Sequence, residues 1–343
     1  MCGRTGGCGE AGIRGRRGRL KILVSTSAFT RFDPASLERL RACGCAVILN
    51  PHGRRLRPEE TAALLEGAVG VVAGTEAYPA YLLTGARGLR AISRVGVGVD
   101  GIDLEAAARL GIAVRSTPEA PTGAVAELTL GLLLALARRI AEADRAVRGG
   151  RWSPPAGRLL EGRTLGVVGL GRIGRRVVEL CAPLRMRLLA REPAPDPVFV
   201  RRHGVALVDL ETLLAEADVV SLHVPLTGET HRLLGPERLA RMRPGALLIN
   251  TARGGLVDEA ALAEALAAGR LARAALDVFE EEPYAGPLRG LETAVPTAHM
   301  GSATRETRIA MERAAVENLL EALGPAGARD GGSARPPLGQ AAE

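Results

Sequence analysis

Three side chains that could move a proton or bind an anion each follow a short apolar run in the second half of the sequence. They are Arg253, Glu282 and His299, and the runs before them, predicted to be strands, are residues 246–250, 274–277 and 293–297. Because ligands bind beyond the carboxyl ends of parallel strands, we expect these groups to face one crevice. Taken singly, His299 would be a satisfied loop histidine, Arg253 part of a surface ion pair, and Glu282 one more acid.

A glycine-rich segment, Gly169-Leu170-Gly171-Arg172-Ile173-Gly174, lies between a predicted strand (164–168) and a predicted helix (172–180). In such a turn the first glycine permits a tight bend, the second lets a pyrophosphate approach, and the third lets helix and strand pack closely. The phosphate then lies at a helix N-terminus. Glu192 follows the next predicted strand and would accept hydrogen bonds from ribose hydroxyls. We expect NAD. Arg191 leaves NADP as an alternative cofactor. The alternative explanation of the glycine pattern is an ordinary glycine-rich loop that binds no nucleotide.

With a dinucleotide beside them, the three groups fit hydride transfer between a 2-hydroxy acid and nicotinamide. An imidazole, with an ordinary pKa of about 6.5, suits the proton step. Glu282 would orient the ring of His299 and favour its protonated form. Arg253 would bind the substrate carboxylate as a fork. Backbone N–H groups of Gly96-Val97-Gly98 would hold the same carboxylate.

Other reactive residue types indicate less. His223 ends a predicted strand among apolar neighbours, so we expect a structural role or a contact with the cofactor. Trp152 is predicted to pack at the domain junction. The five cysteines show no metal-ligand spacing with histidine, so no metal is expected, and their sparse use favours a reducing compartment.

Length and composition favour a globular protein of two domains. The chain has 343 residues, 47% of them hydrophobic and 2% aromatic, and a domain takes ~100–200 residues. Residues 1–19 are rich in arginine and are expected to form a disordered basic tail, with binding of nucleic acid or anionic lipid as the alternative. The uncharged run 128–137 is shorter than the ~20 residues of a membrane span. A cytoplasmic protein with no membrane or nucleic-acid partner is expected.

Runs rich in Val, Ile and Leu alternate with helical patterns, which predicts parallel sheets covered on both faces. The first series of predicted strands is 20–24, 46–49, 69–73 and 91–95, and the second adds 164–168, 187–190 and 219–223 to the three named above. Residues 96–103 interrupt the pattern between the two units. One long helix is predicted over 123–147, and a last one over 303–323 could return to the first unit.

At these residues the sequence resembles the D-isomer-specific 2-hydroxyacid dehydrogenase family, most nearly its D-3-phosphoglycerate dehydrogenase-like branch. The matching blocks, in the family's order, are residues 94–100, 102–104, 124–128, 166–174, 221–226, 249–255, 257–259, 275–279, 282–283 and 299–302. The resemblance implies an α/β protein of two doubly wound parallel-sheet domains. A Rossmann NAD-binding domain (103–297) would be inserted into a flavodoxin-like substrate domain (20–102 and 298–323), and residues 324–343 would form a disordered tail.

The resemblance also implies roles for individual residues. Arg253, Glu282 and His299 would be the family's catalytic trio, Arg172 and Ile173 would contact the pyrophosphate, and Glu192 the adenosine ribose. The rest of the cofactor cleft would be lined by Val97, Val224, Thr251, Ala252, Asp277, Gly301 and Ser302, with Asp277 on the carboxamide side of the nicotinamide. Members commonly dimerise through the cofactor domain and its long helix, so a homodimer is expected.

One departure from the family bears on the substrate. Many phosphoglycerate enzymes carry an Arg-Ser pair where this chain reads Ala73-Gly74-Thr75-Glu76. The loss of a cation and the gain of an acid favour a substrate without a phosphate, either a 2-hydroxy acid or a 2-keto acid. The alternatives are D-3-phosphoglycerate dehydrogenase of serine biosynthesis and a non-catalytic NAD(H)-sensing protein like the corepressor relatives. The intact trio argues against the second alternative.

Overall fold

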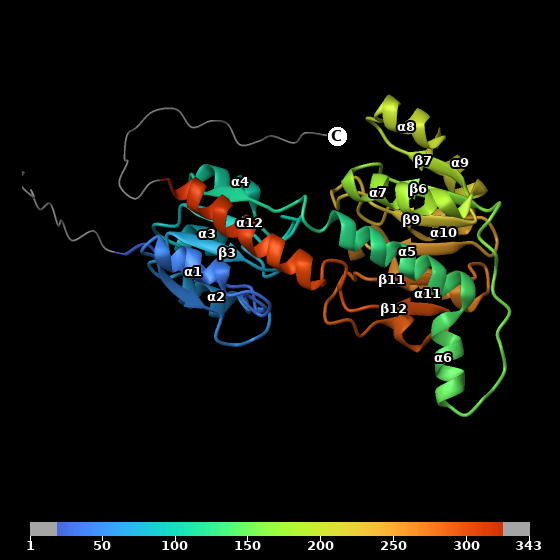
Figure 1. The fold of residues 1–343 in the computed structure, drawn as a ribbon, viewed down its shortest axis with the longest axis horizontal. Coiled ribbons are helices and arrows are strands. Elements are labelled where there is room, and N and C mark those ends of the chain that lie inside the picture. Colours follow the sequence, from blue (N-terminus) through green and yellow to red (C-terminus); the bar gives the residue numbers. More distant parts are fainter. Residues whose placement is uncertain (1–18, 325–343) are drawn as a thin grey trace, which may run out of the picture.

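The computed structural model describes residues 19–324, which form two parallel β-sheets with helices packed against them (Figure 1). The five-stranded sheet has the order β2-β1-β3-β4-β5, and the seven-stranded sheet has the order β12-β11-β10-β9-β6-β7-β8. The first is the flavodoxin-like order and the second extends the Rossmann order by one strand. The predicted fold class is confirmed. The tails predicted over 1–19 and 324–343 lie, but for residues 19 and 324, outside the described residues.

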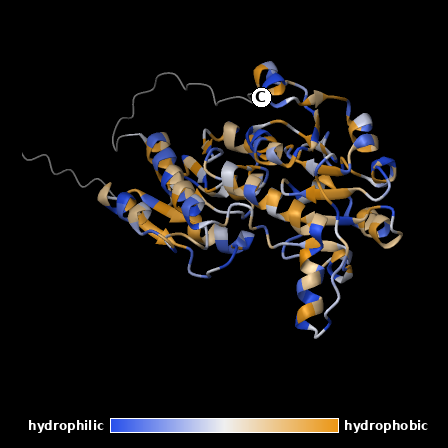
Figure 2. Ribbon diagram, turned by 45° about the vertical axis from the view of Figure 1, so that its right-hand side comes forward, coloured by the Kyte–Doolittle hydropathy of each residue, from blue (hydrophilic) through white to orange (hydrophobic). Residues whose placement is uncertain are grey.

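Apolar runs form the five-stranded sheet. Its strands are β1 (Lys21–Val24), β2 (Ala46–Leu49), β3 (Gly70–Ala73), β4 (Ala91–Arg94) and β5 (Ala113–Arg115), and its helices are α1 (Ala35–Ala42), α2 (Pro58–Leu65), α3 (Ala80–Gly85) and α4 (Leu104–Arg109). Every residue of β3 is buried, as expected for a central parallel strand covered on both faces. Figure 2 shows hydrophobic residues concentrated in the strands and hydrophilic ones on the outer faces of the helices.

The seven-stranded sheet is built in the same way. Its strands are β6 (Thr164–Val168), β7 (Arg187–Arg191), β8 (Ala206–Leu207), β9 (Val219–Leu222), β10 (Leu247–Asn250), β11 (Arg273–Leu276) and β12 (Ala294–Pro296). Its helices are α5 (Thr122–Arg138), α7 (Arg172–Cys181), α8 (Pro197–His203), α9 (Leu210–Glu216), α10 (Pro236–Arg241) and α11 (Glu259–Ala267), with short 3-10 turns η1 (Ala182–Leu184), η2 (Gly254–Leu256) and η3 (Pro287–Gly290). Each strand predicted from the sequence is found within one residue of its expected ends.

The helix predicted over 123–147 is wrong as one element, because α5 and α6 (Ile140–Arg148) are separated at Arg139. This residue adopts the left-handed conformation, with φ 55, which an α-helix of L-residues does not continue through. The Arg139 guanidinium bonds Glu142, which also accepts a hydrogen bond at 2.6 Å from Arg273 of β11. These ion pairs stabilise the break, after which α6 points away from the domain (Figure 1). The periodicity of apolar residues carries no information about such ion pairs.

The first unit extends further along the chain than predicted. Strand β5 pairs with β4 in the five-stranded sheet, so the chain leaves that sheet after residue 115 and the predicted boundary at 102/103 falls inside it. Both β5 and β8 were missed because they have three and two residues. The last helix, α12 (Arg305–Leu323), packs on β3, β4 and β5, and therefore returns to the first unit.

Trp152 does not pack at the junction of the two units. Its side chain is 90% exposed, on the segment that follows α6. Within the described residues no helix combines the length and the apolar character needed to cross a membrane.

Candidate active site

A cavity of about 810 Å³ lies between the two sheets. It is bordered by residues that follow the carboxyl ends of β1, β3 and β4 on one side and of β6, β9, β10 and β11 on the other. This is the crevice where doubly wound sheets bind ligands. Arg253, Glu282 and His299 all border it, so the fold brings the predicted trio together.

His299 and Glu282 form a hydrogen-bonded pair. Nδ1 of His299 lies 2.9 Å from Oε2 of Glu282 and 3.1 Å from its Oε1. A carboxylate can only accept, so Nδ1 carries the hydrogen and Nε2 is the ring nitrogen left to exchange a proton. Burial opposes ionisation of Glu282, but the hydrogen bond and charge of His299 outweigh it and hold the pKa of that carboxyl below its usual value.

Asp277 holds the loop that carries His299. Its buried carboxylate accepts hydrogen bonds from the Thr297 hydroxyl at 2.6 Å and from the Met300 and Gly301 amides at 2.9 and 2.7 Å. Its carbonyl oxygen accepts the His299 amide at 2.9 Å. His299 has φ 49, a left-handed conformation that a side chain adopts at a cost and that these bonds maintain. Asp277 borders the cavity, yet its carboxylate oxygens serve this loop.

Arg253 lies against the turn that follows β4. Its Nε donates to Asp100 at 2.9 Å and its Nη1 to the Ala252 carbonyl at 2.6 Å. A Cβ at Gly98 would lie 1.5 Å from Nη2 of Arg253, so only glycine leaves room for this guanidinium. Buried Asn250 ties the turn together by donating to the Arg253 carbonyl at 2.8 Å.

The three amides predicted to hold a substrate carboxylate are not equivalent. Gly96 borders the cavity, but its N–H already donates to the Thr117 hydroxyl at 2.8 Å. Val97 and Gly98 border the cavity, and no acceptor for their amides occurs in residues 19–324. Gly96 instead provides a φ of 140 and the space that the Arg94 guanidinium fills. A turn that folds back on Thr117 could not be read from the sequence.

The glycine turn has the geometry that a pyrophosphate requires. Gly169 has φ 96, and a Cβ at Gly174 would lie 2.0 Å from the Gly169 carbonyl oxygen. A Cβ at Gly171 would meet no atom within 4 Å. Gly171, Arg172 and Ile173 border the cavity, where the first N–H groups of α7 have no intrahelical acceptor. These residues fit a dinucleotide phosphate.

The remaining predicted cofactor residues divide into two groups. Those that border the cavity are Val97, Val224, Thr251, Ala252, Asp277, Gly301 and Ser302. Gly169, Gly174 and Glu192 do not. Glu192 accepts the Leu170 amide at 2.6 Å and the Ala194 amide at 3.1 Å, which holds this carboxylate beside the glycine turn.

His223 borders the same cavity and is neutral. Burial lowers its pKa to about 4, and its Nε2 lies 2.8 Å from the Ser221 hydroxyl. On the helix side, Thr251 is hydrogen-bonded to Thr129 of α5 at 2.9 Å. Both contacts hold side chains in the wall of the cavity.

Sequence reasoning missed several cavity residues of the first unit. Arg55, Arg94, Asp100 and Arg308 border the cavity with the trio. Burial and the charge of Arg253 lower the pKa of Arg94 to about 10, which leaves it cationic at neutral pH. Asp100 ends the block of residues 94–100 that resembles the family. Its position two residues after Gly98 was the only feature of the sequence that could have placed it in the site.

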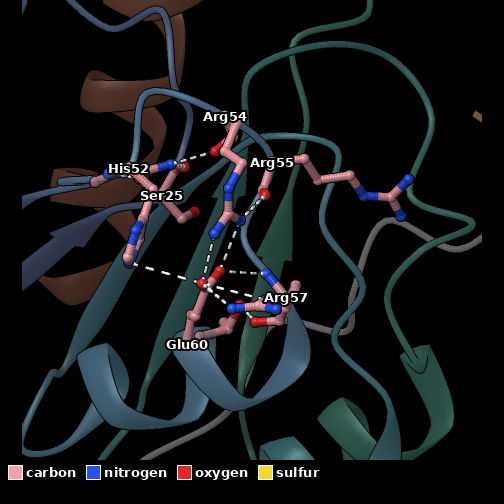
Figure 3. Close-up of polar contacts among 8 residues, drawn as sticks. Ser25, His52, Arg54, Arg55, Arg57 and Glu60 are labelled. Atoms are coloured by element: carbon pink, nitrogen blue, oxygen red, sulfur yellow. Dashed lines mark hydrogen bonds and ion pairs between the residues drawn. The ribbon is translucent and has the colours of Figure 1, made fainter. Parts of the chain in front are cut away.

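Arg55 belongs to the loop between β2 and α2, which Glu60 organises. Glu60 accepts hydrogen bonds from Arg54 at 2.6 and 2.8 Å and from the Arg57 amide at 2.9 Å. The bond from Arg54 contributes most to a pKa of Glu60 well below its usual range. Figure 3 shows Arg54 and Arg57 turned toward Glu60 and the Arg55 side chain turned away. The loop thus leaves Arg55 free to border the cavity.

Comparison with known proteins identifies the family. The NAD binding domain of D-isomer specific 2-hydroxyacid dehydrogenases matches residues 130–301. The chain is 44% identical over 257 residues to glyoxylate reductase of Aeropyrum pernix, covering 72% of this chain and 77% of that protein. It is 42% identical over 254 residues to D-3-phosphoglycerate dehydrogenase of Archaeoglobus fulgidus, covering 73% of this chain and 48% of that relative. The chain therefore spans about half the length of the second relative.

Solved structures agree. The TT0316 protein of Thermus thermophilus superposes with a TM-score of 0.81 at 45% identity, covering 89% of this chain and 97% of that chain. A glyoxylate reductase from Paecilomyes thermophila superposes with a TM-score of 0.80 at 28% identity, covering 88% and 95%. The chain belongs to the D-isomer specific 2-hydroxyacid dehydrogenase family, which confirms the family predicted from its motifs. It is an oxidoreductase with a domain for NAD or NADP.

Proposed function

We propose that this chain is an NAD-dependent D-2-hydroxyacid dehydrogenase, which transfers a hydride between nicotinamide and a D-2-hydroxy acid or its 2-keto acid. The observation that carries the proposal is that the hydrogen-bonded pair of His299 and Glu282 borders the same cavity as Arg253 and the glycine turn. A proton donor, an anion binder and a phosphate cradle in one crevice are the groups that this reaction needs.

The chain's own residues handle the proton and the carboxylate. Nε2 of His299 would give a proton to the substrate oxygen in reduction and take it back in oxidation, while Glu282 stabilises the protonated ring. Arg253 and the amides of Val97 and Gly98 would bind the substrate carboxylate and polarise the reacting oxygen. Asp100 holds Arg253 in that orientation through its bond at 2.9 Å. When bound, the nicotinamide supplies or accepts the hydride.

Glu192 supports NAD over NADP. A carboxylate at the end of β7 accepts hydrogen bonds from ribose hydroxyls and repels a 2′-phosphate. Arg191 is the only neighbour in sequence that would favour NADP. We expect a higher kcat/KM with NADH than with NADPH on the same 2-keto acid.

The direct test is a 2-keto acid screen on the purified full chain. Glyoxylate, hydroxypyruvate, pyruvate and phosphohydroxypyruvate are supplied with NADH or NADPH, and loss of reduced-cofactor absorbance is followed. Chiral chromatography of the product should give the D-isomer. Binding of NADH without turnover of any 2-keto acid would contradict the proposal and favour an NAD(H)-sensing protein.

D-3-phosphoglycerate dehydrogenase is the second candidate, and it would place the chain in the phosphoglycerate branch of the family. Arg55 favours it, since its guanidinium borders the cavity and forms no ion pair within residues 19–324. Arginine binds phosphate in a bidentate fork. A kcat/KM on phosphohydroxypyruvate well above that on hydroxypyruvate, abolished in Arg55→Ala, would decide for this candidate.

We also propose that the chain forms a homodimer through its second unit. Helix α6 leaves that unit (Figure 1), and it and the segment after it expose Ile140, Val147, Trp152 and Leu159. Exposed apolar side chains gathered on one projecting segment are typical of an interface. Light scattering should give the mass of two chains, and Trp152→Ser with Leu159→Ser should shift it toward one.

A further inference from the structure

A buried carboxylate of the first unit faces the cavity and has no role in the reaction described above. Glu76 follows β3 and is 3% exposed. It borders the cavity together with Arg253 and His299, and it also borders a smaller adjoining cavity that both of these residues share. An acid so deeply buried costs free energy unless hydrogen bonds or a ligand compensate for it.

One oxygen of Glu76 is fully used. Oε1 accepts hydrogen bonds from the Gly74 amide at 2.8 Å, from the Tyr78 hydroxyl at 3.0 Å and from the Ser25 hydroxyl. Oε2 accepts none from residues 19–324, and it is not sealed off from the cavity. The side chain therefore presents one free acceptor to whatever occupies the cavity.

The groups that hold Oε1 are themselves rigid. Tyr78 is completely buried, and burial together with the charge of Glu76 raises its pKa well above its usual value, so its hydroxyl stays protonated and donates. Ser25 is buried directly after β1, and its carbonyl accepts a hydrogen bond from Nδ2 of the Asn50 side chain at 2.7 Å. Figure 3 shows Ser25 beside the loop that carries Arg55. Glu76 is thus a fixed group, which favours selectivity because little ordering is needed on binding.

Three cations that border the cavity with Glu76 are engaged with other groups, whereas Arg55 forms no ion pair within residues 19–324. Arg94 donates to the Val95 carbonyl, Arg253 is paired with Asp100 at 2.9 Å, and Arg308 faces Glu312 at 3.5 Å. Glu76 takes part in no ion pair with any residue from 19 to 324. Since none of these cations pairs with Glu76, its negative charge acts on a ligand in the cavity, where it attracts a hydrogen-bond donor and repels an anion.

We propose that Glu76 determines substrate specificity by accepting a hydrogen bond from a hydroxyl on C3 of the substrate. The substrate class is then a 3-hydroxy-2-keto acid, or the matching 2,3-dihydroxy acid, without a phosphate. The inference rests on the proposed function and deepens it.

The test compares 2-keto acids that differ only at C3, with NADH as the reductant. Pyruvate carries a hydrogen, hydroxypyruvate a hydroxyl and phosphohydroxypyruvate a phosphate. A site that hydrogen-bonds a substrate hydroxyl discriminates strongly against the analogue that lacks it. The wild-type chain should prefer hydroxypyruvate to pyruvate and to phosphohydroxypyruvate by at least ~10-fold in kcat/KM.

The variant Glu76→Gln keeps the shape and an oxygen for Ser25, Tyr78 and Gly74 but removes the charge. It should raise the ratio of kcat/KM for phosphohydroxypyruvate over hydroxypyruvate by ~10-fold or more. Glu66→Gln, an exposed acid at the end of α2, is the matched control and should leave every ratio unchanged.

The outcomes separate the two claims. No turnover of any 2-keto acid by the wild-type chain overturns the proposed function itself. Turnover with equal preference for the three substrates, or with a preference for the phosphate, overturns the role of Glu76. This comparison needs only the wild-type chain and stands even where Glu76→Gln fails to fold. A folded Glu76→Gln with unchanged ratios would also overturn it.

Discussion

The guanidinium of Arg253 occupies the space that a side chain at residue 98 would need: Nη2 lies 1.5 Å from the position of a Cβ on Gly98. The conflict involves the far end of a flexible side chain, so Gly98→Ala should fold and move Arg253. A displacement of about 1 Å at a substrate-positioning group can cost ~10²-fold in rate. We expect a fall in kcat/KM of ~10–10²-fold on the best 2-keto acid.

Gly101→Ala is the control for this change, because the nearest atom to its Cβ would be the Glu76 carbonyl oxygen at 3.4 Å. It lies in the same loop and should retain the wild-type kcat/KM. Equal activity of Gly98→Ala and Gly101→Ala would show that Arg253 is not positioned in this way.

Replacement of His299 by alanine should lower kcat by ~10²–10⁴-fold, the contribution of a positioned acid–base group. NADH affinity, measured by fluorescence titration, should remain near that of the wild type. His203→Ala, on the distant helix α8, serves as the reference. A His299→Ala variant with wild-type turnover would remove this residue from the reaction.

The variant Glu282→Gln should shift the pH dependence of reduction. Without the carboxylate the protonated imidazole loses its partner at 2.9 Å, so the rate should begin to fall at a lower pH than in the wild type. A pH–rate profile of both proteins measures this, and superimposable profiles would contradict the role of Glu282.

The same pair makes a prediction for stability. The pKa of Glu282 lies below its usual 4.5 in the folded chain. Ionisation of Glu282 therefore stabilises the fold at pH values above 4.5, and this stabilisation is lost as the pH falls through the lowered pKa of the folded chain. The difference in Tm between wild type and Glu282→Gln should therefore shrink on acidification. A difference that grows toward low pH would contradict this assignment.

Two of the glycines of the turn can be separated by experiment. A Cβ at Gly174 would lie 2.0 Å from backbone oxygen, so Gly174→Ala should destabilise the protein by about 1–3 kcal/mol, as overpacking does. A Cβ at Gly171 meets no atom within 4 Å, so Gly171→Ala should keep the wild-type Tm and weaken NADH binding. Thermal unfolding and NADH titration of both variants are the measurements, and a reversed pattern would refute the assignment.

Local pattern was sufficient to predict the sheets and the trio. Runs such as residues 70–73 are apolar because both faces of a parallel strand are buried, so burial is encoded residue by residue. The alternation of strands and helices then predicts a parallel sheet. Because ligands meet the carboxyl ends of such strands, Arg253, Glu282 and His299 were predictable as neighbours from their position in the chain alone.

Contacts between distant segments were decided only in the folded chain. Glu142, which pairs with Arg139 at the break of the long helix, also accepts a hydrogen bond from Arg273, and the Gly96 amide donates to Thr117. The sequence by itself determined the fold class, the family and the candidate reacting groups, since these depend on residue type and local period. Only the tertiary structure decided which hydrogen-bond donors reach each polar group, because those donors come from separate strands. For this reason the sequence could not show that one oxygen of Glu76 is left facing the cavity.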